Sequence, residues 1–115
     1  MKIGLIGPVT GVPGYNYSAF NIAAASLKAA GYDVFSPAEI TPPSVLESGT
    51  MGTWRYFMRK TIPALIDCDG IAELPNTATS IGGALERYIM SVLGTPIKDV
   101  QGWIDYARRD YSKDR

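Results

Sequence analysis

Four times along this chain, a short apolar segment is followed by a longer segment with helical spacing of its apolar side chains, and no other feature constrains the fold as strongly. The apolar segments cover residues 2–6, 32–35, 69–74 and 96–100. The helical segments cover about residues 16–30, 54–67, 80–93 and 101–110. This alternation predicts a parallel α/β sheet with helices on both faces and right-handed crossovers.

The segments that follow the predicted strands indicate where a ligand would bind, because parallel α/β sheets bind ligands beyond the carboxyl ends of their strands. They are the glycine-rich loop after Ile6, a long loop over residues 36–53 and the segment over residues 76–86. The first loop is not G-x-G-x-x-G, because Val9 replaces the second glycine, and no Lys-Ser or Lys-Thr follows Gly14. Kinase, NTPase and dinucleotide-dehydrogenase functions are therefore disfavoured.

Composition narrows the chemistry further. The 115 residues fit a single domain over residues 1–115. The 11 acidic and 11 basic residues balance, so no net positive field would hold a nucleic acid polymer or an anionic membrane. The sequence has no histidine, which removes the commonest general base, the histidine-dependent nucleophiles and most zinc and iron sites. We therefore expect no metal and no cofactor.

Cysteine use and hydropathy point to the cytoplasm. Cys68 is the single cysteine, so neither an internal disulfide nor a cysteine metal cluster is expected, as in a reducing compartment. The apolar run after Lys2 is too short for a signal peptide, and the longest apolar stretches are far short of a membrane span.

The segment over residues 76–86 carries the most informative pattern. Ser80 stands at the start of a predicted helix, where free backbone N–H groups and the helix dipole favour an anion such as phosphate. Gly82 and Gly83 leave the first turn without side chains, so a ligand can approach the backbone. Glu86 follows on the same side, and its side chain leans back over the glycines. A partly desolvated carboxylate placed there suits a nucleophile or a stabiliser of a sugar cation.

The same pattern has a structural interpretation. Ser80 is a common helix cap, and Glu86 would then be a surface residue paired with the neighbours of Arg87. The predicted helix also carries an apolar stripe, with Glu86 at its edge. The stripe consists of Ile81, Leu85, Ile89 and Val92.

Several further segments carry a family resemblance, in order along nearly the whole chain. They are residues 1–10, Asn16-Tyr17 with Phe20, residues 36–39, residues 54–59, Cys68-Asp69 and Ser80-x-Gly-x-x-x-Glu86. With this order and spacing, the chain resembles the small phage and bacterial proteins of the nucleoside 2-deoxyribosyltransferase-like superfamily.

The resemblance implies a flavodoxin-like three-layer sandwich with about four or five parallel strands and cleavage of the N-glycosidic bond of a (deoxy)nucleoside or nucleotide. Glu86 matches the glutamate that attacks the anomeric carbon, after which a second base or water resolves the glycosyl-enzyme. Ser80 matches the serine with which the 5′-monophosphate N-hydrolases bind phosphate, whereas transferases acting on free nucleosides tend to have Asp there. The glycine-rich loop after the first strand would approach the sugar-phosphate.

The predicted catalytic residue is therefore Glu86. The predicted substrate-binding residues are Gly7, Pro8, Thr10, Gly11, Ser80, Gly82, Gly83 and Tyr17. Four aromatic residues are expected at the same end of the sheet, where they would stack on a base or pack as core or interface residues. They are Tyr15, Tyr17, Trp54 and Tyr56.

Two positions depart from the family pattern. Gly4 stands where members usually have a tyrosine in the first strand, and Thr61 stands where they usually have an aspartate. Threonine is no general acid at neutral pH. These departures leave a second hypothesis, a non-catalytic module that binds or sequesters a nucleotide on the same fold. A third is an interaction protein whose α/β unit only presents a surface.

Self-association is also predicted. The resemblance implies a homo-oligomer, such as a homodimer, in which a neighbour completes the site. Trp103 and Tyr111 are the aromatic residues expected to be exposed for such a contact.

Overall fold

The computed structural model describes residues 1–9, 12–40 and 51–113. Within these ranges it also describes the surroundings of the side chains, except those of residues 51–54 and 110–113. Within these residues the chain forms a parallel sheet of four strands in the order β2-β1-β3-β4. The strands are β1 (Lys2–Ile6), β2 (Asp33–Phe35), β3 (Gly70–Glu73) and β4 (Ile97–Asp99). The predicted parallel α/β sheet is confirmed, and β1 has the predicted bounds.

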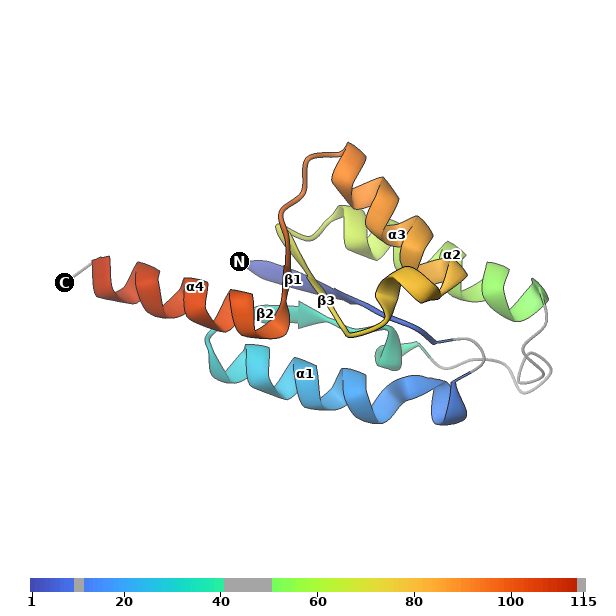
Figure 1. The fold of residues 1–115 in the computed structure, drawn as a ribbon, viewed down its shortest axis with the longest axis horizontal. Coiled ribbons are helices and arrows are strands. Elements are labelled where there is room, and N and C mark those ends of the chain that lie inside the picture. The colour runs from blue at the N-terminus through green and yellow to red at the C-terminus, as the bar shows by residue number, and fades with distance from the viewer. Residues whose placement is uncertain (10–11, 41–50, 114–115) are drawn as a thin grey trace.

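Helices cover both faces of the sheet, as the alternation predicts (Figure 1). The four α-helices are α1 (Tyr17–Ala29), α2 (Met51–Ile66), α3 (Ile81–Val92) and α4 (Val100–Lys113). Helices α1 and α4 pack together on one face, whereas α2 and α3 pack together on the other. The structure is thus the expected three-layer, flavodoxin-like sandwich. None of the described helices has the length and apolar character needed to span a membrane.

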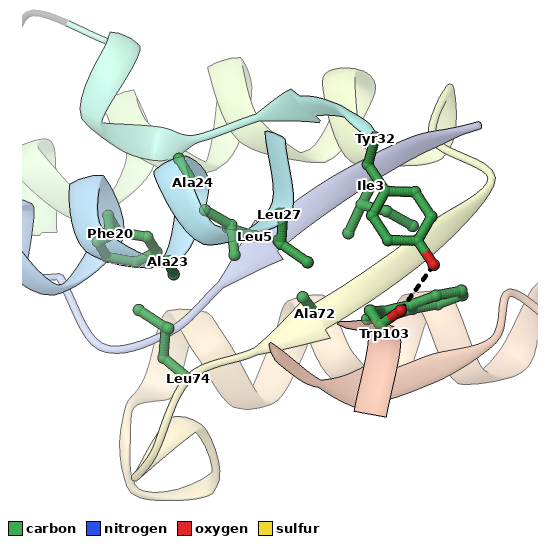
Figure 2. Packing of buried hydrophobic residues seen from close by; sticks show 10 residues of the cluster. All are labelled: Ile3, Leu5, Phe20, Ala23, Ala24, Leu27, Tyr32, Ala72, Leu74 and Trp103. Carbon is green, nitrogen blue, oxygen red and sulfur yellow. Dashed lines mark hydrogen bonds between the residues drawn. The ribbon is translucent and has the colours of Figure 1, made fainter. Parts of the chain in front are cut away.

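The core between the sheet, α1 and α4 is built around Trp103 (Figure 2). Its indole N–H donates to the Ile71 carbonyl, and the Tyr32 hydroxyl donates to the Trp103 carbonyl, each at 2.7 Å. Trp103 is only 1% exposed, so the prediction of an exposed Trp103 is wrong. The side chain satisfies its donor inside the core, where its large apolar surface is removed from water.

Two helix starts lie close to their predicted positions but differ in detail. Asn16 is the N-cap residue of α1, yet its side-chain amide donates to the Pro8 carbonyl at 3.1 Å instead of capping the helix. This contact ties α1 to the loop after β1. Helix α2 begins at Met51 and continues through Pro63, where the sequence predicts a kink or a new first turn. The long predicted loop is therefore shorter, and it contains a 3-10 turn, η2 (Pro37–Glu39).

Helix α3 turns a different face toward the sheet from the one that its apolar stripe suggests. Ile81 is 79% exposed and Val92 67% exposed, whereas the buried residues are Gly82, Gly83, Glu86 and Met90. A Cβ atom on Gly83 would lie 2.9 Å from the Thr77 carbonyl oxygen. The glycine side of the helix therefore packs inward, because only glycine permits this approach. The two ends of the stripe turn outward, whereas Leu85 is half-buried and Ile89 still packs against the core.

Candidate active site

A pocket lies beyond the carboxyl ends of β1 and β2, where the topology predicts the ligand site. It comprises about 340 Å³ of unfilled space, including the part open to solvent. The loop after β1, the turn η2 and the helices α2 and α3 all contribute to its wall. The lining residues are Gly7, Val9, Pro37, Phe57, Met58, Thr61, Ser80, Gly82, Gly83 and Glu86.

Ser80 organises the start of α3. It is the N-cap residue, and its hydroxyl oxygen accepts a hydrogen bond from the Gly83 N–H at 3.3 Å. The N–H groups of Ile81 and Gly82 precede the first intrahelical bond, so they point out of the helix end. The partial positive charge of the helix terminus thus lies at the pocket wall.

Glu86 lies inside the pocket wall and not on the surface. It is 4% exposed, and desolvation raises its pKa from 4.5 to about 7. The neighbouring cation, Arg87, is instead bonded to Glu73, with 2.8 Å between Nε and Oε2. Glu86 is therefore a buried carboxylate that no ion pair stabilises among the described residues, and about half of it is ionised near neutral pH.

Thr61 of α2 faces the same pocket. It is 2% exposed, and its hydroxyl has no hydrogen-bond partner of ordinary geometry in the described part of the chain. It is close enough to Glu86 to favour the ionised carboxylate, against the larger effect of burial on the pKa. The sequence interpretation treats Thr61 only as a missing acid. Thr61 lies one turn after Phe57, another lining residue, and the packing of α2 against α3 brings both to the pocket.

An aromatic group adjoins the pocket through Phe57. The Tyr15 ring lies 5.8 Å from the rings of both Phe57 and Tyr17, measured between centroids, and Tyr56 contacts Phe57 at 5.9 Å. The Tyr15 hydroxyl is buried and has no partner among the described residues, whereas the Tyr17 hydroxyl donates to the Ile40 carbonyl at 2.8 Å. Tyr15, Tyr17 and Tyr56 thus gather as predicted; the side chain of Trp54 lies outside the described residues.

The structure brings together most of the predicted site residues that it describes. Those at the pocket wall are Gly7, Ser80, Gly82, Gly83 and Glu86. Pro8 and Tyr17 are not part of the wall: the first is adjacent to it in sequence, and the second reaches it only through Tyr15 and Phe57. Thr10 and Gly11 lie outside the described residues. The sequence analysis missed Val9, Pro37, Phe57 and Met58, which line the pocket as well.

The usual family tyrosine has no counterpart at the first strand for a steric reason. A Cβ atom on Gly4 would lie 2.6 Å from Leu65 Cδ2 and 2.9 Å from Cys68 Sγ. The space beside β1 is therefore filled by Leu65 of α2 and by Cys68, so any side chain at position 4 requires these atoms to move. Within the described residues, no three of the side chains of His, Cys, Asp and Glu come together as a metal site.

Comparison with known proteins agrees with this architecture. The fold places the chain among proteins with the α/β fold of nucleoside 2-deoxyribosyltransferases. It is similar to the solved structure of a 2-deoxyribosyltransferase from the psychrotolerant bacterium Bacillus psychrosaccharolyticus, with a TM-score of 0.61 and 24% sequence identity over 84% of this chain and 69% of that chain. This likeness confirms the predicted fold.

The sequence also matches the model of a protein family. Residues 1–99 match the family described as "Domain of unknown function (DUF4406)", and the chain belongs to this family. No curated protein matches the chain at a significant level.

Proposed function

We propose that residues 1–115 act as one nucleoside 2-deoxyribosyltransferase-like domain that cleaves or transfers at the N-glycosidic bond of a (deoxy)nucleoside 5′-monophosphate or nucleoside. The observation that carries the proposal is Glu86, a carboxylate 4% exposed at the wall of a pocket and without a cationic partner in the described chain. A buried, unpaired carboxylate destabilises a fold, so we expect it to be retained for a function. Perturbed groups of this kind in pockets are typical of catalytic residues.

Glu86 is the nucleophile in this proposal. One carboxylate oxygen attacks the anomeric carbon, the bond from that carbon to the base nitrogen breaks, and the electron pair leaves with the base, which takes up a proton from water. Water (in a hydrolase) or a second base (in a transferase) then attacks the same carbon and releases the Glu86 carboxylate. A desolvated carboxylate suits this role because it loses no hydration shell as it attacks.

Phosphate recognition is assigned to the start of α3. Ser80 and the outward-pointing N–H groups of Ile81 and Gly82 would hold a 5′-phosphate, and Gly7 would lie along the sugar. The support is geometric, since Ser80, Gly82 and Gly7 all belong to the wall that contains Glu86. The aromatic group beginning at Phe57 is the surface on which a base would stack.

The decisive experiment measures release of free base from a panel of deoxynucleoside and ribonucleoside 5′-monophosphates and the corresponding nucleosides. Wild-type protein is compared with Glu86→Gln, and Glu73→Gln is the matched control, because Glu73 makes only a surface ion pair. Loss of the nucleophile is expected to lower the rate by several orders of magnitude. Equal rates for wild type and Glu86→Gln would contradict the proposal.

A non-catalytic nucleotide-binding module is the second candidate. Two observations favour it: the space for a tyrosine at position 4 is filled by Leu65 and Cys68, and the pocket has Thr61 in place of an acid. Titration calorimetry that finds tight binding of a 5′-monophosphate, together with no base release by wild type, would select this candidate. Absence of binding by every nucleotide would remove both.

The proposal includes self-association through the outer face of α3. Ile81, Tyr88 and Val92 are each at least two-thirds exposed, and Leu93 is 57% exposed. With the half-buried Leu85, residues 81, 88 and 92 follow the 4-3-4 spacing of a helix-pairing seam, and Leu93 adjoins its end. Their exposed apolar surface is on the order of 500 Å², comparable to the largest patch of a typical monomer and over half of what one partner buries in a stable interface. A second copy supplies an equal stripe.

A further inference from the structure

Thr61 is an unusual threonine for the interior of a helix. Such a residue normally donates its hydroxyl to the backbone carbonyl three or four residues earlier. In α2 the Thr61 hydroxyl makes no such bond, although the side chain is 98% removed from solvent and the atom itself is buried. An unsatisfied buried hydroxyl destabilises the folded protein. We therefore expect a neighbouring group to accept the hydrogen of this hydroxyl.

The acceptor that shares its surroundings is Glu86. Both residues line the pocket between α2 and α3, and the Thr61 hydroxyl favours the ionised carboxylate. The other hydroxyl of the described wall, that of Ser80, accepts the Gly83 N–H and keeps its own O–H to donate. It already has one protein partner, whereas the buried Thr61 hydroxyl has none among the described residues. At position 4, packing against Leu65 leaves no space for a tyrosine hydroxyl. Thr61 is thus the buried hydroxyl of the described wall that lacks a partner and can donate to Glu86.

We propose that the Thr61 hydroxyl is a positioning donor that holds one oxygen of the Glu86 carboxylate, so that the other oxygen faces the ligand space. The inference rests on the proposed function only for its catalytic consequence, since the proposed hydrogen bond would form in the protein without a ligand. The terminal torsion of a glutamate side chain has a broad distribution, and a single hydrogen-bond donor restricts it. The hydroxyl is too weak an acid to act in place of an aspartate, so its effect is exerted through Glu86.

The charged groups around this pair are few. The described pocket wall contains no ionisable side chain besides Glu86. On α2, Arg59 and Lys60 are exposed. On α3, Arg87 is bonded to Glu73 of β3. A change at Thr61 is therefore expected to act on the carboxylate directly.

The test is a titration of the Glu86 side-chain carboxyl by carbon-13 NMR in the protein without any substrate. Three variants are compared with wild type: Thr61→Val, which keeps the shape and removes the donor; Thr61→Ser, which restores the donor; and Thr95→Val, a control in the loop between α3 and β4. The Glu86 midpoint, about 7 in wild type, is expected to move upward in Thr61→Val and to remain near the wild-type value in Thr61→Ser and Thr95→Val.

An unchanged midpoint in folded Thr61→Val would overturn the inference. So would an equal upward move in Thr61→Ser, because that variant keeps the hydroxyl and the shift would then not depend on the donor. Urea unfolding of each variant establishes that the native fold is retained. Since the titration needs no turnover, it gives its answer even if no nucleotide is cleaved. Where base is released, the acid limb of kcat for Thr61→Val is expected to move upward with the carboxyl.

Discussion

Glu86 and Arg87 are adjacent in α3, yet their charges lie in opposite surroundings. The Glu86 carboxylate is 4% exposed at the pocket wall, whereas the Arg87 guanidinium lies at the surface and donates to Glu73 at 2.8 Å. The guanidinium is thus kept away from the one carboxylate that is buried among the described residues, which it would stabilise. This arrangement leaves the pKa of Glu86 raised by burial, with no neighbouring cation to lower it.

The first prediction concerns stability. Since burial raises the pKa of Glu86 from 4.5 to about 7, the folded protein keeps a proton between these pH values that the unfolded chain has released. The resulting contribution is full below pH 4.5, decreases as the pH rises and is lost above about 7. Ionised Glu86 therefore destabilises the fold by about 3 kcal/mol at pH 8.

Glu86→Gln removes this penalty and is expected to raise the free energy of unfolding by about 1–3 kcal/mol at pH 8, with little change at pH 4. Urea denaturation at both pH values measures the effect. Glu73→Gln, which loses only a surface ion pair, is expected to change stability by less than about 1 kcal/mol at pH 8. A Glu86→Gln protein less stable than wild type at pH 8 would contradict the assignment of an unpaired buried charge.

The second prediction concerns the pH dependence of activity. Because the nucleophile must be ionised, kcat for base release is expected to rise with pH and to reach half of its plateau near the Glu86 pKa, about 7. At pH 6 the rate is then about one tenth of the plateau. Initial rates measured from pH 5 to pH 9 at saturating substrate test this. A plateau that extends unchanged down to pH 5 would show that the reacting carboxylate is not this one.

The third prediction separates phosphate recognition from catalysis. Ser80→Ala removes the N-cap acceptor of the Gly83 N–H and a group of the pocket wall, so KM for a 5′-monophosphate is expected to rise about tenfold or more. KM for the unphosphorylated nucleoside is expected to change little. Stability falls by about 1 kcal/mol from the lost cap. Thr79→Ala is the matched control, because its hydroxyl donates to the exposed Asn76 carbonyl outside the wall. Equal losses for both substrates would argue against a phosphate site at Ser80.

The fourth prediction concerns the glycine turn of α3. A Cβ atom at position 83 would lie 2.9 Å from the Thr77 carbonyl oxygen, which is backbone and has little freedom to move. Gly83→Ala is therefore expected to destabilise the protein by about 1–3 kcal/mol, although alanine favours a helix. Ser91→Ala, on the exposed side of the same helix, is expected to be neutral or slightly stabilising. Thermal or urea unfolding compares the two, and a stabilised Gly83→Ala would show that the close approach is absent.

The contrast within α3 shows how far local pattern determines this fold. The bounds of β1 and the start of α3 at Ser80 follow from signals within a few residues, so the sequence predicts them well. The buried face of α3 depends instead on the approach of Gly83 to the Thr77 carbonyl of the preceding turn and on packing against α2 and the sheet, so hydrophobic periodicity alone misplaces Ile81 and Val92. The period of the helix is local, whereas its rotation is a tertiary property.

The site residues fall into the same two groups: those that local sequence predicts and those that only tertiary packing brings together. Ser80, Gly83 and Glu86 lie within one short segment, where helix geometry alone brings them to one side. Thr61 and Phe57 join them from another helix, so only the packing of α2 against α3 reveals them. Comparison with the family pattern identifies Thr61 only as a position that has lost the usual aspartate. The structure instead shows a buried hydroxyl near the carboxylate.

The final prediction tests the outer face of α3. Tyr88 is 68% exposed and Val92 67% exposed, so both place apolar surface in water. Because neither side chain is part of the core, a charged substitution at these positions is expected to disrupt only an intermolecular contact. Sedimentation velocity of wild type is expected to give a dimer or larger assembly, and Tyr88→Glu with Val92→Glu is expected to give a monomer that retains its helix content. Ile22→Glu, an equally exposed apolar position (67%) on α1, is the control and is expected to sediment as wild type does. A monomeric wild type would exclude pairing through this face, whereas an assembly dispersed only by Ile22→Glu would place the contact on the opposite side of the sheet.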